Sequence, residues 1–200
     1  MRKVVLFISS YEREKSNSYL IGEYIEKNLS GKVKCKKVFL EEESVRDLNR
    51  EFKEADNIVL ISSLRYDKLN KFSKEFIYKI KEENKREDFF RSKKFSAILS
   101  GDSELLRETE SLNLLLDGFS KICNKRYITW QKGIGVLARM NLFEIGLDEN
   151  VIEYEQLIIE LELFCQDLLN DKSYHNNSFA IPKKGGSFFK FINNKLKGFT

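Results

Sequence analysis

The sequence predicts a three-layer α/β fold, in which helices cover both faces of a five-stranded parallel sheet. Two observations carry this prediction. Apolar runs such as Val4–Ile8 and Ile58–Ile61 cannot have one face in water, so they are typical of strands that are buried on both sides of a parallel sheet. These runs alternate strictly with amphipathic segments, as expected when right-handed crossovers place a helix between successive parallel strands.

The first strand leads through a polar loop into the first helix. Ten polar or small residues, 9–18, follow the strand, and an apolar pattern at helical spacing comes next. That pattern consists of Tyr19, Leu20, Tyr24, Ile25 and Leu29. We expect one of residues 16–18 to cap the start of this helix and Gly31 to end it.

Four more strands are predicted at 32–40, 57–63, 93–101 and 127–138. The lysine-rich, partly alternating pattern of the second strand is typical of an edge strand. In the last strand, Gly133 and Gly135 indicate a bulge or a close backbone approach.

Apolar residues at helical spacing predict four further helices, at 45–52, 69–80, 105–123 and about 151–170. Five strand–helix units fit the strand order 2-1-3-4-5, whose ligand crevice opens at the carboxyl ends of the first and third strands. This order predicts a site made by three loops, 9–18, 62–68 and 100–104.

The composition is that of one globular domain with a full core. Hydrophobic residues make up 42% of the 200 residues and charged residues 33%. No apolar stretch is as long as a membrane span, and the first residues lack the pattern of a secretory signal. We therefore expect a cytoplasmic protein.

Cysteine and histidine chemistry is disfavoured by the sequence. Cys35, Cys123 and Cys165 are far apart and form no CxxC pair, and His175 is the only histidine. We expect small buried or half-buried thiols and no metal site. With one histidine, Ser–His and Cys–His nucleophile systems lack their usual base, so we assign no catalytic side chain.

The charge distribution divides the chain into a domain, residues 1–171, and a basic, aromatic tail, residues 172–200. The tail has six lysines and no acidic side chain, which leaves the domain a formal charge of −2 within a total of +4. Its last part, 179–200, is interpreted as an apolar face that docks on the domain or on a second subunit. An anionic membrane surface is the alternative partner, and nucleic acid is disfavoured because no recognition motif accompanies the lysines.

The polar loop at 9–18 is a candidate phosphate loop. A helix that begins at the carboxyl edge of a sheet directs its first free N–H groups at that edge, where they bind anions. The competing interpretation is plain helix capping by the polar residues 16–18, and the two roles are compatible.

The loops resemble those of the flavodoxin-like family of NAD(P)H-dependent FMN reductases, and the resemblance spans nearly the whole chain. In the first loop, Lys-Ser-Asn-Ser-Tyr at 15–19 is similar to the family's phosphate loop. Past the third loop, the stretch at 128–136 resembles the family's Trp-x-Gly-Gly-x-Gly motif. The resemblance implies four residues that bind the flavin phosphate: Ser10, Ser16, Asn17 and Ser18.

The second and third loops resemble the family's flavin-ring loops. Residues 63–70 are similar to the turn that lies along the isoalloxazine ring, and residues 100–104 stand where relatives commonly have Cys-Gly-Phe-Pro-Glu. The resemblance implies that six residues of these loops contact the flavin: Leu64, Arg65, Tyr66, Asp67, Gly101 and Asp102.

All three loops also depart from the family's pattern. Glu12 stands in place of an arginine, and Glu12 and Glu14 would repel a phosphate if they pointed inward. Arg13 and Lys15 would offset that repulsion. In the third loop, Asp102 replaces a phenylalanine.

The resemblance implies an FMN-binding oxidoreductase that takes hydride from NADH or NADPH and passes electrons to a flavin, quinone or other small acceptor. Flavin chemistry needs few protein side chains, so the lack of acid–base residues does not count against it. Relatives commonly dimerise, which implies a homodimer. The alternative, favoured by the departures, is a non-catalytic flavodoxin-fold interaction or membrane-surface module with an eroded flavin site.

Overall fold

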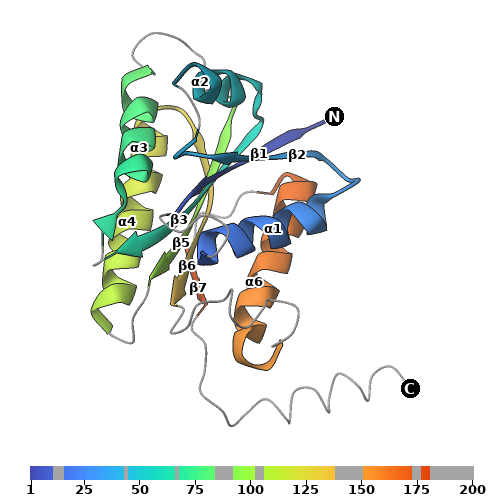
Figure 1. Cartoon of the computed structure of the whole chain (residues 1–200), viewed down its shortest axis with the longest axis vertical. Helices are drawn as coiled ribbons and strands as arrows, with labels where there is room; N and C mark the ends of the chain where they lie inside the picture. Colours follow the sequence, from blue (N-terminus) through green and yellow to red (C-terminus); the bar gives the residue numbers. More distant parts are fainter. Residues whose placement is uncertain are drawn as a thin grey trace.

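The computed structural model describes eight segments of the chain: 1–10, 16–42, 45–65, 68–83, 92–101, 106–137, 151–172 and 177–180. The strands are β1 (Lys3–Ser9), β2 (Lys34–Phe39), β3 (Asn57–Arg65), β4 (Lys68–Leu69), β5 (Lys94–Gly101), β6 (Thr129–Leu137) and β7 (Ser178–Ala180). The helices are α1 (Asn17–Leu29), α2 (Val45–Glu54), α3 (Lys71–Glu83), α4 (Leu106–Lys125) and α6 (Val151–Asn170). Figure 1 shows these elements around one central sheet.

The main strands form a parallel sheet in the order β2-β1-β3-β5-β6-β7. Because β5 and β6 are the fourth and fifth predicted strands, the predicted order 2-1-3-4-5 is confirmed, with the lysine-rich β2 at one edge. Two strands lie outside the prediction. β7 comes from the segment that is expected to be tail and pairs in parallel with β6, and the two-residue β4 pairs antiparallel with the end of β3.

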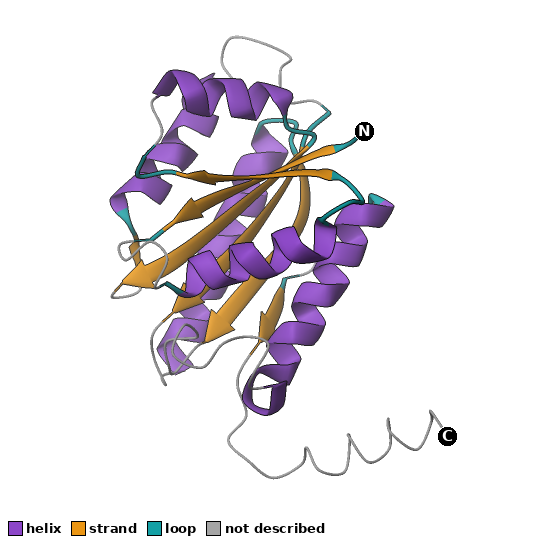
Figure 2. Ribbon diagram, turned by 45° about the vertical axis from the view of Figure 1, so that its right-hand side comes forward, coloured by secondary structure: helices purple, strands orange, loops and turns teal. Residues whose placement is uncertain are grey.

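Helices cover both faces of the sheet, as predicted (Figure 2). α2, α3 and α4 pack on one face, and α1 and α6 pack on the other. Strand β1 contributes to a hydrophobic core on each face. Val5 and Phe7 pack in the core with α2, α3 and α4, whereas Val4, Leu6 and Ile8 pack in the core with α1 and α6. Every residue of β1 is buried, which confirms the two-sided burial inferred from its sequence.

Helix α3 begins later than predicted, because Leu69 lies in β4 and not in the helix. Asn70 caps α3: its Oδ1 accepts a hydrogen bond from the backbone N of Ser73 at 2.8 Å. Leu69 pairs with Leu64 in the β3–β4 ladder, and both leucines are buried in the core beneath α3. Leu69 therefore fits the apolar spacing of the helix, although it lies in a strand. Leu105, predicted near the start of α4, lies outside the described residues.

Strand β6 has close neighbours at Gly133. A Cβ atom at this position would lie 2.5 Å from Asn177 Oδ1 and 2.9 Å from Cζ2 of the Trp130 ring. The close approach predicted for this strand is confirmed at Gly133. The bulge lies two residues earlier, at Gln131, which the β5–β6 register leaves without a partner.

A buried charge network holds α2 against the amino ends of β1 and β2. Lys3 Nζ donates to Glu51 Oε2 at 2.9 Å, and Lys36 Nζ donates to Glu51 Oε1 at 2.7 Å. Glu51 is only 2% exposed. Burial alone would raise the pKa of Glu51, but the hydrogen bonds from Lys36 and Lys3 outweigh burial and lower the pKa to about 2.

The cysteines are free thiols, with Cys123 and Cys165 buried and Cys35 half-buried. Burial raises the pKa of each thiol to about 12, so all three stay protonated near neutral pH. In the described part of the chain, no three His, Cys, Asp or Glu side chains are grouped so as to hold a metal ion. None of the helices found there has the length and apolar character that a membrane crossing requires.

We predict that Gly133→Ala destabilises the protein by about 1–3 kcal/mol, because the new methyl group meets the Trp130 ring and the Asn177 side chain. The matched control is Gly118→Ala in α4, where a Cβ atom meets nothing within 4 Å. Helix propensity favours alanine there by about 0.5–1 kcal/mol. Urea unfolding measures both free energies, and a Gly133→Ala variant as stable as the wild type would contradict the packing around Gly133.

We predict that Glu51 makes stability depend on pH in the acid range. The pKa of Glu51 in the folded protein, about 2, lies below its ordinary value of 4.5. Its stabilising effect is therefore complete above pH 4.5 and is lost as the pH falls toward 2. The loss in the free energy of unfolding is on the order of 3 kcal/mol and is measured by urea unfolding at a series of pH values.

The variant Glu51→Gln should lack this acid-dependent component and should lose about 3 kcal/mol at neutral pH, because Lys3 keeps a buried charge with one partner fewer. The control is Glu75→Gln, which removes an exposed pair with Lys71 and should change stability by less than about 0.5 kcal/mol. An identical pH profile in Glu51→Gln and the wild type would refute the assignment.

Candidate functional site

Serines stand at the ends of three neighbouring strands at the carboxyl edge of the sheet. Ser9 of β1 lies opposite Ser62 of β3, and Ser63 of β3 lies opposite Ser100 of β5. This register brings the starts of the three predicted site loops to one edge. The location of the candidate site follows from the strand order, as the sequence predicts.

Helix α1 begins at this edge with Ser16 as its cap. The backbone of Ser16 is extended, and its Oγ accepts a hydrogen bond from the N–H of Tyr19 at 3.1 Å. The first intrahelical bond runs from Leu20 N to Ser16 O. The N–H groups of Asn17 and Ser18 precede that bond, so they are the helix's natural anion-binding groups. The predicted capping is confirmed, while phosphate binding stays a prediction.

Three serine hydroxyls connect α1 with β3 and β5. Ser18 Oγ lies 2.7 Å from Ser63 Oγ, and Ser100 Oγ donates to Ser63 Oγ at 3.1 Å. Ser18 and Ser100 are buried, and Ser63 is half-buried. The hydroxyl of Ser18, an expected phosphate ligand, is thus engaged with the sheet and holds the start of α1 in place.

A carboxylate lies against the first loop. Glu41 follows β2, and its Oε1 accepts hydrogen bonds from the backbone N of Ser10 at 2.8 Å and from Ser9 Oγ at 2.9 Å. Ser9 Oγ also lies 2.8 Å from Asn70 Oδ1. Asn70 is 2% exposed, and its Nδ2 has no hydrogen-bond partner among the described residues.

The second predicted loop is only partly described. Leu64 is 5% exposed, lies opposite Leu69 and is part of the core beneath α3. The backbone of Arg65 pairs with β4. Tyr66 and Asp67 lie outside the described residues, so their contact with a flavin ring stays a prediction.

The third loop begins at Gly101, which is buried, ends β5 and lies opposite Leu137 of β6. Asp102 lies outside the described residues, as do residues 11–15 with the four charges discussed for the first loop.

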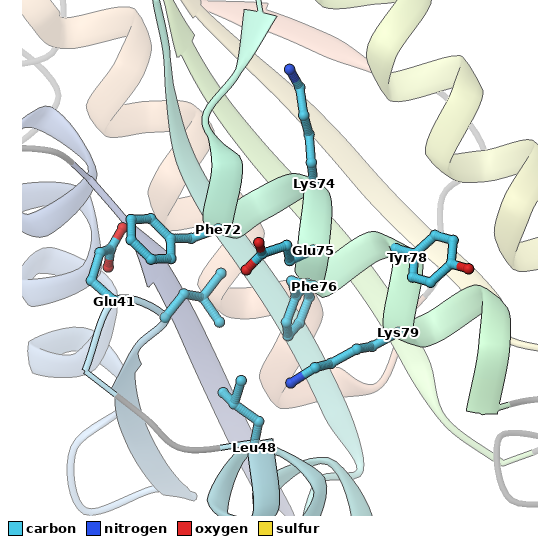
Figure 3. A pocket seen from close by; sticks show the side chains of 9 residues that line it. Glu41, Leu48, Phe72, Lys74, Glu75, Phe76, Tyr78 and Lys79 are labelled. Carbon is cyan, nitrogen blue, oxygen red and sulfur yellow. The ribbon is translucent and has the colours of Figure 1, made fainter.

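A cavity of about 550 Å³ lies beside this edge, between the end of β2, α2 and α3 (Figure 3). Leu48, Phe72 and Phe76 contribute to its apolar wall, and Figure 3 shows Lys79 extending toward Leu48. Glu41 also lines the cavity. The same carboxylate therefore borders both the cavity and the serines at the strand ends.

Sequence reasoning placed Ser63, Asn70 and Ser100 within the second and third loops without singling them out as contacts, and it missed Glu41. For the two serines a signal was present, because each stands at or near the end of a predicted buried strand. Glu41 begins an acidic run with no motif spacing, so only the pairing of β1 with β2 reveals its place.

Solved proteins with this architecture cover most of the chain. The FMN-dependent NADH-azoreductase from Bacillus anthracis str. Ames Ancestor, solved in complex with FMN, has a TM-score of 0.61 and 12% identity, with 85% of this chain and 100% of that chain covered. The NADPH-quinone reductase from P. pentosaceus has a TM-score of 0.60 and 13% identity, with coverages of 82% and 98%. The flavodoxin from Streptococcus pneumoniae TIGR4 has a TM-score of 0.57 and 14% identity, with coverages of 86% and 99%.

No family model and no curated protein matches the sequence. Identities of 12–14% to the solved structures show likeness of fold. With TM-scores of 0.57–0.61 and 98–100% of each of these structures covered, the likeness extends over the whole fold. The chain therefore has the flavodoxin-like fold that the resemblance in its loops implies.

Proposed function

We propose that the protein is an FMN-binding oxidoreductase that takes hydride from NADH or NADPH and passes electrons to a flavin, quinone or other small acceptor. The observation that carries this proposal is the start of α1 at the carboxyl edge between β1 and β3, beside the serines that end the strands. Among proteins of this fold, the azoreductase named above is described as FMN-dependent and the quinone reductase as using NADPH, which supports the proposal.

The described residues fit the phosphate end of FMN. The N-terminus of a helix of 13 residues favours a negative charge by about 0.3–2 kcal/mol, and its first turn contains no acidic residue. The side chains at the start of α1 are short and let the backbone approach an anion; these residues are Ser16, Asn17 and Ser18. Glu41 is the opposing feature, because its carboxylate lies at Ser10.

When bound, FMN supplies the hydride-accepting ring, so the chain's task is to bind and orient it. In this proposal Ser10, Ser16, Asn17 and Ser18 hold the phosphate. Gly101 ends β5 at the same edge, and the bond between Ser18 and Ser63 fixes the angle at which α1 meets the sheet. The ring contacts proposed for Leu64, Arg65, Tyr66, Asp67 and Asp102 rest on the sequence resemblance.

We expect the purified protein to bind FMN in a saturable manner, measured by quenching of flavin fluorescence during a titration. The loaded protein should oxidise NADH or NADPH, measured as loss of nicotinamide absorbance with a quinone as acceptor. Absence of quenching at FMN concentrations well above the micromolar range would contradict the proposal.

Two variants of Ser16 separate anion binding from helix capping. Aspartate caps a helix about as well as serine, so Ser16→Asp should keep wild-type stability but weaken FMN binding by about tenfold or more, because it adds a negative charge at the phosphate site. Ser16→Ala removes the cap and should destabilise by about 0.5–2 kcal/mol. Unchanged FMN affinity in Ser16→Asp would mean that the start of α1 is not the phosphate site.

One observation favours a second candidate function. The carboxylate of Glu41 at Ser10 is unfavourable to a phosphate and agrees with an eroded flavin site. The protein would then be a non-catalytic flavodoxin-fold module that attaches to anionic membranes through its basic tail. This function is favoured if FMN does not bind and if vesicles that contain phosphatidylserine, but not pure phosphatidylcholine vesicles, retain the full chain. The matched control is a chain that ends at Ala180, which keeps β7.

A further inference from the structure

We propose that Glu41 sets the affinity of the carboxyl-edge site for phosphate-bearing ligands, by holding an internal carboxylate against the start of the phosphate loop. This inference rests on the proposed FMN site and concerns how that site is regulated. In this arrangement, a ligand phosphate and the Glu41 carboxylate compete for the same region of the loop.

The carboxylate is placed by backbone structure. Beyond the end of β2, Leu40 N still donates to Ile8 O at 2.9 Å, so the β1–β2 ladder continues to the residue before Glu41. Glu42 N then donates to Phe39 O at 3.1 Å and closes a turn. The backbone of Glu41 is held between these two bonds, close to the end of β1.

The contacts of Glu41 are those expected of a bound anion. Its Oε1 accepts from a backbone N–H and from a hydroxyl, at Ser10 and Ser9, with distances of 2.8 and 2.9 Å. No Lys or Arg among the residues that the structure describes forms an ion pair with Glu41. Within these segments the carboxylate of Glu41 is bound by neutral donors, which leave its negative charge in place.

A second polar side chain, Asn70, lies at the same place. Asn70 shares Ser9 with Glu41, since its Oδ1 lies 2.8 Å from Ser9 Oγ. Asn70 is 2% exposed, and its Nδ2 lacks a hydrogen-bond partner within the described segments. A buried amide donor without an acceptor is unfavourable, and this one belongs to a side chain that contacts the same serine as Glu41.

A phosphate held by the first loop would therefore lie near a fixed negative charge. For charges a few ångströms apart in a medium between the interior of a protein and water, removal of that charge should strengthen binding by about tenfold. The effect should be confined to ligands with a phosphate.

The test compares FMN with riboflavin, which has the same ring and no phosphate, in fluorescence titrations of the full chain. Glu41→Gln keeps an oxygen that can accept from Ser10 N and removes only the charge. The matched control is Glu42→Gln, which removes a charge from the adjacent exposed residue. If thermal melting shows that Glu41→Gln is unfolded, Glu41→Ala takes its place.

We expect Glu41→Gln to bind FMN about tenfold more tightly than the wild type, with riboflavin binding and the Glu42→Gln control unchanged. Equal FMN affinity in Glu41→Gln and the wild type would overturn the inference and leave the proposed function standing. FMN binding by Glu41→Gln but not by the wild type would support the inference and overturn the proposed function. No FMN binding by either protein would overturn both.

Discussion

Burial of β1 on both faces determines how the other strands and helices are arranged. A strand with every side chain buried needs a strand on each side and a helical layer on each face. Right-handed crossovers meet both needs when the strands run parallel, so their carboxyl ends gather at one edge. From that edge the chain leaves β1 for α1 on one face and β3 for α3 on the other, which is the arrangement at which open α/β sheets generally bind ligands. The position of the candidate site thus follows from the core.

The two edges of the sheet differ in their electrostatics. At the amino edge, Lys3 and Lys36 pair with the buried Glu51, so these charges are used within the protein and stabilise the contact between α2 and the sheet. At the carboxyl edge, hydroxyls and the start of α1 provide donors, and Glu41 provides a carboxylate bound by neutral groups. Mutually paired charges stabilise a fold but offer little to a ligand, whereas the start of a helix favours an anion. The polarity of the sheet therefore separates a stabilising edge from the proposed binding edge.

The fold was predictable because its signals are local. The apolar runs of β1 and β3 predict that both strands are buried, and Ser16 predicts the start of α1 to within one turn. Strands β4 and β7 escape such reasoning because two or three residues are too few to show a period. Glu41 and Asn70 both contact Ser9, which is distant from them in the sequence, so the spacing of residues along the chain does not predict these contacts. The resemblance in the loops names flavin contacts, and of these the structure describes Ser10, Ser16–Ser18, Leu64, the backbone of Arg65 and Gly101.

We propose that the carboxyl edge between β1 and β3 binds a phosphate at the start of α1. The most direct measurement is a backbone amide NMR titration of isotope-labelled protein with FMN, since it reports which N–H groups meet the ligand. If the FMN phosphate binds at the start of α1, we expect the largest shifts at Ser10, Asn17 and Ser18, with smaller ones at Ser63 and Gly101. Shifts that cluster at the amino edge near Lys3, or none at saturating FMN, would contradict it.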